Sequence, residues 1–350
     1  MQATPWPDTN GKVITFVVDL RSRVACFDSI HRQAAPEFMV PEIQSSSSVP
    51  TPSAYFPVVL PAKPTPQAPT AAEPVVLPAL PRCTVWDVPF DCVTMTQAVD
   101  RIEQLIDRGE PSYVITANLN YVMLHHQFSD IPQITADAEL VLADGQPIVW
   151  RSKLGERTLP ERVAGSEMIY QLAARASQKR WGIYFLGGEP GVAETCAKRL
   201  FKDYPGMRIA GIESPPFRSL TEREQADQEA RIKNSGADIL LVAFGQPKGE
   251  RWIHRNHRRL GVPVSIQLGA SFDFIAGTAR RAPKVWRRCG AEWAFRMCSD
   301  PKRLVPRYFG NAKFLFAALI NEWKQTVADW GMSLDEPETA GRRQTDQRAS

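Results

Sequence analysis

Asp144 stands between two apolar stretches of the chain and is followed directly by Gly145, in the segment "LVLADGQPIVW". Asp-Gly is a common turn dipeptide, so the acid could simply form a turn between two buried segments. A carboxylate held at the end of a strand could instead accept a proton from a substrate. This stretch alone leaves both interpretations open.

Two further segments that could bind a ligand also follow apolar stretches. In "TANLN", Thr116, Asn118 and Asn120 could make turn hydrogen bonds or could recognise carbohydrate or phosphate. In "FLGGEPGVAETCAKRL", Gly187 and Gly188 open a glycine-rich turn before a helical pattern. Such a turn can direct backbone N–H groups at a phosphate, or it can be no more than a tight connection, and it matches neither GxGxxG nor a Walker motif.

The segment "VAFGQPKGERWI" places an amide, a cation and an acid in one turn after an apolar stretch. Gln246 could bond sugar hydroxyls or a nucleotide base, and Lys248 could meet a phosphate. Glu250 could sit in the first turn of the next helix, where a negative charge is favourable. We therefore expect this loop to contact a ligand.

Lys and Arg crowd the segment 280–316, in which Glu292 and Asp300 are the only acids and bulky apolar residues interleave. A solvated helix would mix both charges, so this composition favours an anionic partner, which could be a diphosphate, an anionic lipid or a nucleic acid. The alternative is an ordinary amphipathic helix with basic residues at its margins.

Alternating helical and strand patterns predict an α/β fold, with a mostly parallel, Rossmann-like sheet, helices on both faces and a basic C-terminal helical appendage. Ligands of such sheets bind beyond the carboxyl ends of the strands. Asp144, Gly187 and Gln246 all lie at or directly after the carboxyl ends of predicted strands. Ser166 is predicted to cap its helix. The predicted strands are 112–120, 140–145, 181–188, 207–212, 237–245 and 262–269, and the predicted helices are 94–109, 130–139, 166–180, 191–206, 221–236 and 248–261.

The composition is that of a soluble globular protein, with 43% hydrophobic and 23% charged residues among 350. Its six cysteines are scattered without a CxxC pair, which is typical of reduced thiols in a cytoplasmic protein. No apolar run approaches the roughly 20 residues that span a bilayer. A net charge of +4 is too small to indicate a nucleic-acid binder by itself. We expect neither export nor a membrane span.

The chain divides by composition into five parts. Proline crowds the second part, which favours an extended, solvated linker. The predicted parts are an N-terminal extension (1–35), a disordered Pro-rich linker (36–82), the α/β core (83–279), the basic amphipathic appendage (280–330) and a disordered tail (331–350).

Seven motifs, over roughly residues 83 to 325, resemble in order and spacing those of the WecG/TagA/CpsF family of bacterial glycosyltransferases. They are "TANLNYV", "ADGQPIV", "LPERVAGSE", "FLGGEPGVAE", "GQPKGERWI", "GASFDFIAGTARRAP" and "AEWAFRMCSDPKRLVPRY". The resemblance implies an inverting hexosyltransferase that moves a sugar of the N-acetylmannosamine, N-acetylmannosaminuronic acid or glucose type. The implied donor is a UDP-sugar, and the acceptor is a polyprenyl-diphosphate-linked saccharide used for surface polysaccharide.

The resemblance also implies where the protein acts and with what partners. The enzyme would be cytoplasmic and peripheral, on the inner face of the cell membrane, with its C-terminal tail meeting anionic lipid and its core self-associating. No nucleic acid and no cofactor are expected. The chain has no DxD motif, with Asp137-x-Glu139 the nearest approach, so a metal site is not expected either.

Position by position, the resemblance implies Asp144 as the general base for the acceptor hydroxyl. Such a base needs its pKa raised, which burial beside an apolar strand could supply. Gly249 departs from the family, because many members carry Gln there. The remaining implied residues line the sugar pocket or clasp the diphosphate through guanidinium groups: Thr116, Asn118, Arg162 and Gln246 for the pocket, and Arg296, Arg303 and Arg307 for the diphosphate.

Two other functions compete with this one. The chain could be a non-catalytic binder of lipid-linked diphosphate or anionic membrane that uses the basic appendage. A nicotinamide-dependent reductase would depend on "LGGEPG" alone, and that segment lacks the Rossmann spacing.

Overall fold

The computed structural model of the chain describes residues 77–216, 218–283, 286, 292–299 and 301–329. The predicted N-terminal extension, most of the Pro-rich linker and the predicted tail lie outside the described residues. The first strand begins at Arg82, and Leu77 and Leu80 already pack against the core.

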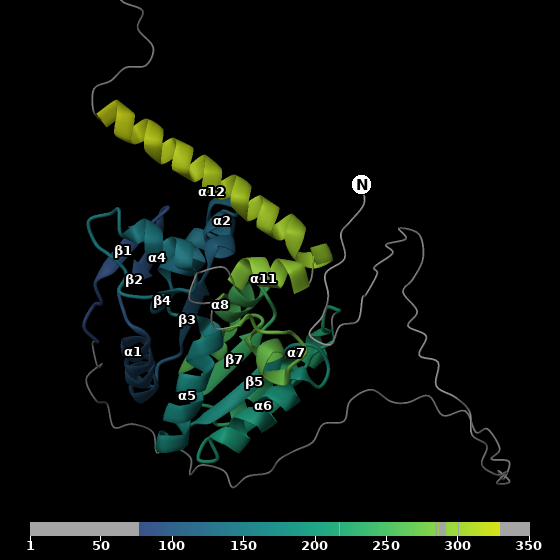
Figure 1. The fold of residues 1–350 in the computed structure, drawn as a ribbon. Helices are drawn as coiled ribbons and strands as arrows, with labels where there is room; N and C mark the ends of the chain where they lie inside the picture. Colours follow the sequence, from purple (N-terminus) through teal and green to yellow (C-terminus); the bar gives the residue numbers. More distant parts are fainter. Residues whose placement is uncertain (1–76, 217, 284–285, 287–291, 300, 330–350) are drawn as a thin grey trace, which may run out of the picture. The chain divides into compact units, whose positions relative to one another are not determined.

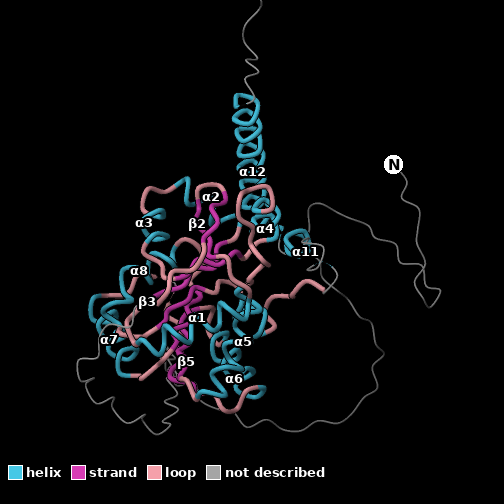
Figure 2. Tube along the Cα trace, turned by 90° about the vertical axis from the view of Figure 1, so that its left-hand side faces the viewer, coloured by secondary structure: helices cyan, strands magenta, loops and turns pink. Residues whose placement is uncertain are grey.

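A six-stranded, wholly parallel sheet forms the centre of the described fold, with the strand order β4-β3-β8-β7-β5-β6. Figure 2 shows these strands between two layers of helices. The predicted α/β class is therefore confirmed. The strands are β3 (Ser112–Ala117), β4 (Leu140–Ala143), β5 (Gly182–Gly187), β6 (Arg208–Glu213), β7 (Ile239–Ala243) and β8 (Val264–Gln267).

Neighbouring side chains along a strand enter two different hydrophobic cores, because successive residues of a strand point to opposite faces. In β3, for example, Val114 enters one core and Ile115 the other. The first core packs under α1 (Met95–Arg108), α5 (Gly165–Lys179), α6 (Val192–Asp203) and α9 (Ser271–Ala276). The second packs under α2 (Leu119–Gln127), α3 (Ile131–Ala136), α4 (Gln146–Ser152), α7 (Glu222–Asn234) and α8 (Lys248–Leu260).

Five elements are absent from the predictions: the strands β1 (Arg82–Val85) and β2 (Val88–Asp91), which form an antiparallel hairpin, and the helices α2, α4 and α9. The strand predicted to continue to Asn120 ends at Ala117, because Asn118 adopts an extended N-cap conformation and its Oδ1 accepts from Tyr121 N at 3.2 Å. Sequence patterning alone does not show that the chain changes direction there.

Ser166 does not cap α5, so that prediction is wrong. The helix begins one residue earlier, at Gly165, with Ala164 at the N-cap and no side-chain cap bond. A Cβ at Gly165 would lie 3.2 Å from Leu268 Cδ2, so this end of the helix lies close to the residue that follows β8. The Ser166 hydroxyl instead accepts a hydrogen bond from Arg281 Nη2 at 3.3 Å.

Two C-terminal helices follow the core, α11 (Glu292–Ser299) and the long α12 (Pro301–Asp329), which passes beside α2 (Figure 1). The Phe314 ring of α12 packs edge-on against the Trp86 ring, with 6.5 Å between the ring centroids, and in a tilted arrangement against the His126 ring, with 5.2 Å between the centroids. Arg151 of α4 donates to both carboxylate oxygens of Glu322 at 2.8 Å. Among the described residues, no helix combines the length and apolarity needed to cross a bilayer.

Candidate functional site

The polar residues predicted to bind a ligand follow strands that all run in the same direction. Because the sheet is parallel, the loops after β3, β4, β5 and β7 leave it at one edge. Hydrogen bonds connect the ends of β4 and β7 to the end of β3: Asp144 N donates to Ala117 O at 2.9 Å, and Gln246 Nε2 donates to Thr116 O at 3.5 Å. The structure thus brings Thr116, Asp144 and Gln246 to the same edge.

Asp144 follows β4 directly, and its side chain is 25% exposed, so the apolar strand does not enclose it. Gly145 is the N-cap of α4, which means that the Asp-Gly pair leads from a strand into a helix. Arg162, in the loop before α5, places its Nη1 3.8 Å from Asp144 Oδ1. The predicted base and the predicted pocket arginine therefore lie together.

Gln246 is held by Asn120, whose Nδ2 donates to Gln246 Oε1 at 3.2 Å. Asn120 is buried and lies in the first turn of α2. It was one of the polar residues of "TANLN", but nothing in its spacing indicated that it would contact a loop 126 residues away. Asn120 was a candidate within "TANLN" but was not among the residues assigned to the sugar pocket, and the structure places it against Gln246.

Thr116 and Asn118 each have a structural hydrogen bond. The Thr116 hydroxyl is buried and donates to Gln267 O, the last residue of β8, at 3.0 Å. Asn118 Oδ1 caps α2. The turn-bond interpretation of Asn118 is correct for this oxygen, and both residues hold β3 and α2 in place beside Asp144.

The glycine-rich turn after β5 shows the geometry of a tight connection. Gly187 has φ +106°, and a Cβ there would lie 2.9 Å from Ala243 O, so the backbones of β5 and β7 approach closely. Gly188 has φ +75°, and its N–H donates to Ala243 O at 3.2 Å. That N–H is thus directed at β7 and not at a ligand position. The helix α6 begins after Gly191, further along the chain.

Lys248 and Glu250 lie in the first turn of α8 but in opposite environments. Lys248 is exposed and Glu250 is buried, which matches the expected place of an acid near a helix N-terminus. Gly249, between them, is packed against the side chain of Gln267, since a Cβ there would lie 2.5 Å from Gln267 Cδ. The glycine that departs from the family pattern is therefore required by its neighbour on β8.

The basic residues expected to clasp a diphosphate fall in the C-terminal helices. Arg296 lies in α11, and Arg303 and Arg307 lie in α12. Their side chains lie outside the described part of the structure. Their role stays a prediction.

Two titratable groups of α2 have shifted pKa values, Tyr121 and His125, and burial lowers the pKa of the His125 imidazole. Burial raises the pKa of the Tyr121 phenol, and its hydrogen bond with Thr135 at 2.8 Å opposes that shift. A phenol that stays protonated inside the core supports α2 and does not take part in proton transfer.

The acids nearest to a DxD pattern are engaged in ion pairs. Asp137 pairs with His254 at 2.8 Å, and Glu139 pairs with Arg108 at 2.7 Å. In the described ranges, no group of three His, Cys, Asp or Glu residues could hold a metal ion.

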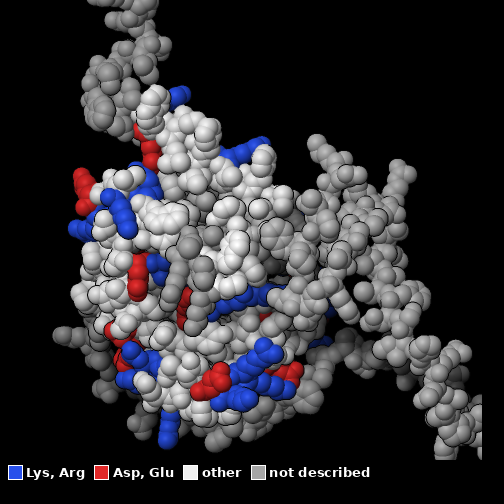
Figure 3. Space-filling model, in the orientation of Figure 1, with Lys and Arg blue, Asp and Glu red and all other residues white. Residues whose placement is uncertain are grey.

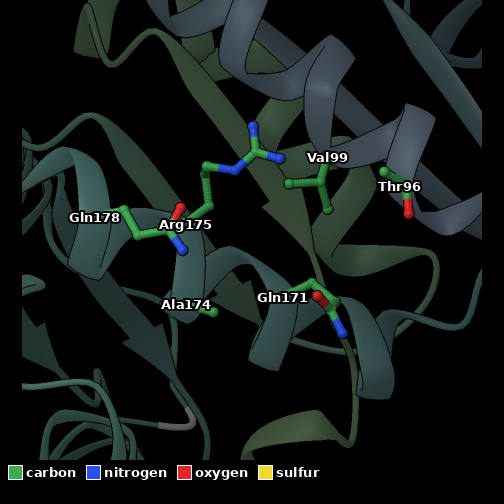
Figure 4. Close-up of a pocket in the computed structure, with 6 residues that line it drawn as sticks. All are labelled: Thr96, Val99, Gln171, Ala174, Arg175 and Gln178. Carbon is green, nitrogen blue, oxygen red and sulfur yellow. The ribbon is translucent and has the colours of Figure 1, made fainter.

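A cavity of about 170 Å³ lies between α1 and α5 (Figure 4). Its Arg175 is paired with Asp100 at 2.8 Å and with Glu103. On the face shown in Figure 3, other acidic side chains likewise lie next to basic ones. The cavity contains none of the predicted site residues; it is lined by Thr96, Val99, Gln171, Ala174, Arg175 and Gln178.

A parallel α/β sheet with helices on both faces defines a doubly wound protein, a class whose ligands bind at the carboxyl ends of the strands. The sequence model of the WecG/TagA/CpsF family of glycosyl transferases matches residues 83–328, and the chain belongs to this family.

Three curated relatives carry the name N-acetylglucosaminyldiphosphoundecaprenol N-acetyl-beta-D-mannosaminyltransferase. The protein of Bacillus spizizenii is 30% identical over 220 residues, which cover 61% of this chain and 84% of the relative. That of Bacillus subtilis is 28% identical over 231 residues, covering 64% and 88%. That of Staphylococcus aureus strain MW2 is 27% identical over 222 residues, covering 62% and 84%.

Proposed function

We propose that this glycosyltransferase moves N-acetylmannosamine from a UDP-sugar to a polyprenyl-diphosphate-linked saccharide, with inversion at the anomeric carbon. The names of the relatives support the sugar and the acceptor. The observation that carries the mechanism is the pairing of Asp144 with Arg162 at the strand edge, beside the Gln246–Asn120 pair. The uronic acid and glucose donors are the alternatives within the same reaction.

In the proposed reaction, Asp144 takes the proton of the acceptor hydroxyl as the hydroxyl oxygen attacks the anomeric carbon. The bond from that carbon to the UDP oxygen breaks on the opposite face, and UDP leaves with the bonding electrons. The Gln246 amide offers a donor and an acceptor to sugar hydroxyls. The arginines of α11 and α12 would stabilise diphosphate charge, for which a guanidinium fork is suited.

The same proposal places the protein on the inner face of the cell membrane. Bulky apolar side chains of α12 are exposed, and Lys313 lies over the Phe309 ring at 4.6 Å, so apolar and basic groups share this helix. That combination suits an anionic lipid surface. We expect no nucleic-acid partner, and self-association of the core stays a prediction. The exposed apolar residues are Val305, Phe309, Phe316, Leu319, Ile320 and Trp323.

UDP release from a panel of UDP-sugars, with a synthetic lipid-diphosphate-linked N-acetylglucosamine acceptor, tests the proposal. Asp144→Asn should lower kcat by about 10²- to 10⁴-fold, the usual contribution of a general base, while UDP-sugar binding is retained. Asp137→Asn, which removes a paired acid elsewhere, is the matched control and should keep activity. EDTA should leave the rate unchanged, since the proposed reaction needs no metal.

The outcomes separate the candidate functions. No UDP release by the wild type with any donor, together with binding to the lipid-diphosphate acceptor, would favour the non-catalytic binder. Binding of NAD(P) in place of UDP would favour the reductase.

A further inference from the structure

Glu167 lies between two arginines that come from different parts of the chain. Its Oε1 is 3.4 Å from Arg162 Nη2 and 3.0 Å from Arg281 Nη2. Arg162 in turn places Nη1 3.8 Å from Asp144 Oδ1. The four charged groups therefore form one row, in the order Arg281, Glu167, Arg162 and Asp144.

Four segments of the fold assemble this row, and Asp144 comes from the residues directly after β4. Arg162 comes from the loop before α5, Glu167 from the first turn of α5, and Arg281 from the segment after α9. The first turn of a helix favours a negative charge, which suits Glu167. Arg281 is held a second time, because its Nη2 also donates to Ser166 Oγ. The side chains are between 18% and 36% exposed, so water screens their charges only in part.

The row divides one guanidinium between two carboxylates. A guanidinium can pair with a carboxylate through two parallel N–H···O bonds, which stabilises the anion strongly. Here Nη2 of Arg162 is turned to Glu167, while its Nη1 lies within ion-pair range of Asp144 but beyond hydrogen-bond distance. A full bidentate pair would make Asp144 a weaker base, because its charged form would be favoured.

We propose that Glu167 is a positioning residue that draws Arg162 away from a bidentate pair with Asp144, and that Arg281 sets how strongly it does so. This inference rests on the proposed role of Asp144 as base. Arg162 keeps the carboxylate oriented without occupying both of its oxygens. Arg281 competes with Arg162 for the same Glu167 oxygen. The segment after α9 therefore affects Asp144 through the two side chains that lie between them, Glu167 and Arg162.

The substitutions Glu167→Gln and Arg281→Gln should shift the acidic limb of the pH profile of kcat/KM in opposite directions. In Glu167→Gln, a negative charge is lost and Arg162 can turn fully to Asp144, so the acidic limb of the kcat/KM profile should move to lower pH. The value of kcat at neutral pH should fall on the order of tenfold, because a weaker base accepts the proton less readily. In Arg281→Gln, Glu167 can pair more closely with Arg162, so the acidic limb should move to higher pH.

The experiment measures UDP release with the lipid-diphosphate acceptor between pH 4.5 and 8, at both donor-saturating and donor-limiting concentrations. Glu139→Gln is the matched control, since Glu139 is also ion-paired with an arginine and similarly exposed, at 34%, but precedes β4 where Asp144 follows it. Its profile should equal that of the wild type. Thermal unfolding of each variant checks that the fold is kept, and Arg281→Gln provides the test should Glu167→Gln not fold.

Opposite shifts of the acidic limb would support the proposal. An acidic limb that stays in place in both variants, or shifts that share one direction, would overturn it. Such a result leaves the proposed function standing if the wild type is active and Asp144→Asn is not. An inactive wild type would instead refute the proposed function.

Discussion

Gly249→Ala should destabilise the protein although alanine favours helices. Gly249 lies in the first turn of α8, and its new Cβ would lie 2.5 Å from Gln267 Cδ. Gln267 is 2% exposed and comes from β8, so it cannot simply swing into solvent. In the amide orientation that satisfies both neighbours, it donates to Val242 O at 2.6 Å and accepts from Gly245 N at 3.0 Å.

The magnitude follows from these contacts. Moving the Gln267 amide breaks two hydrogen bonds, each contributing about 1 kcal/mol, and leaves buried polar groups unpaired at about 1–3 kcal/mol. Replacing a helical glycine by alanine offsets at most about 1 kcal/mol of this loss. We therefore expect the free energy of unfolding to fall by about 2–4 kcal/mol. Because the Gly245–Gln246 loop loses an anchor, KM for the UDP-sugar should rise as well.

Urea denaturation of the wild type, Gly249→Ala, Gln267→Ala and the double variant measures the effect. The two substitutions should be coupled, with the double variant less destabilised than the sum of the singles by about 1 kcal/mol or more. Gly261→Ala is not a suitable control, because Gly261 has φ +71° and would be strained for another reason. Unchanged or increased stability in Gly249→Ala, or additive effects in the double variant, would refute the argument.

Two further predictions concern the C-terminal helix and pH. Arg151→Ala removes a partly exposed ion pair with Glu322, so the free energy that holds α12 against the core should fall by about 0.5–1 kcal/mol. Proteolytic cleavage within α12 should become faster. Lys198→Ala, which removes a surface ion pair elsewhere, should leave the cleavage rate unchanged. Burial lowers the pKa of His257, so the unfolded chain binds its proton more readily and stability should fall as pH drops below about 6.5. Unfolding measured at pH 7 and pH 5.5 should show a smaller decline in His257→Gln, and an equal decline would contradict the assignment.

Local sequence determined most of the elements of this fold. The helix of α1, for example, begins at a capping box of Thr94 and Gln97 and ends at a left-handed Gly109, all signals that neighbouring residues carry. The apolar run that leads into Asp144 likewise predicted a buried strand, and all residues of that strand are buried. Hydrophobic periodicity is a local property, so it predicts which segments are helices and strands.

Contacts between distant segments were decided by the tertiary structure alone. Ser166 looks like a cap in the sequence, but the helix begins at Gly165, beside Leu268, and the Ser166 hydroxyl accepts a hydrogen bond from Arg281. Likewise, nothing near Gly249 indicates that Gln267 fills the space above it. The sheet order places β8 beside β3 and β7, and only that order brings these groups together.

The role of Asp144 illustrates both contributions. Its sequence neighbours allowed a turn or a strand end, and the resemblance of its motif to a glycosyltransferase family suggested the base. The tertiary structure brought Arg162 to within 3.8 Å and joined Glu167 and Arg281 in the same row. These partners come from the loop before α5, from α5 itself and from the segment after α9. The electrostatic environment of a carboxylate depends on distances in space, which local sequence patterns do not carry.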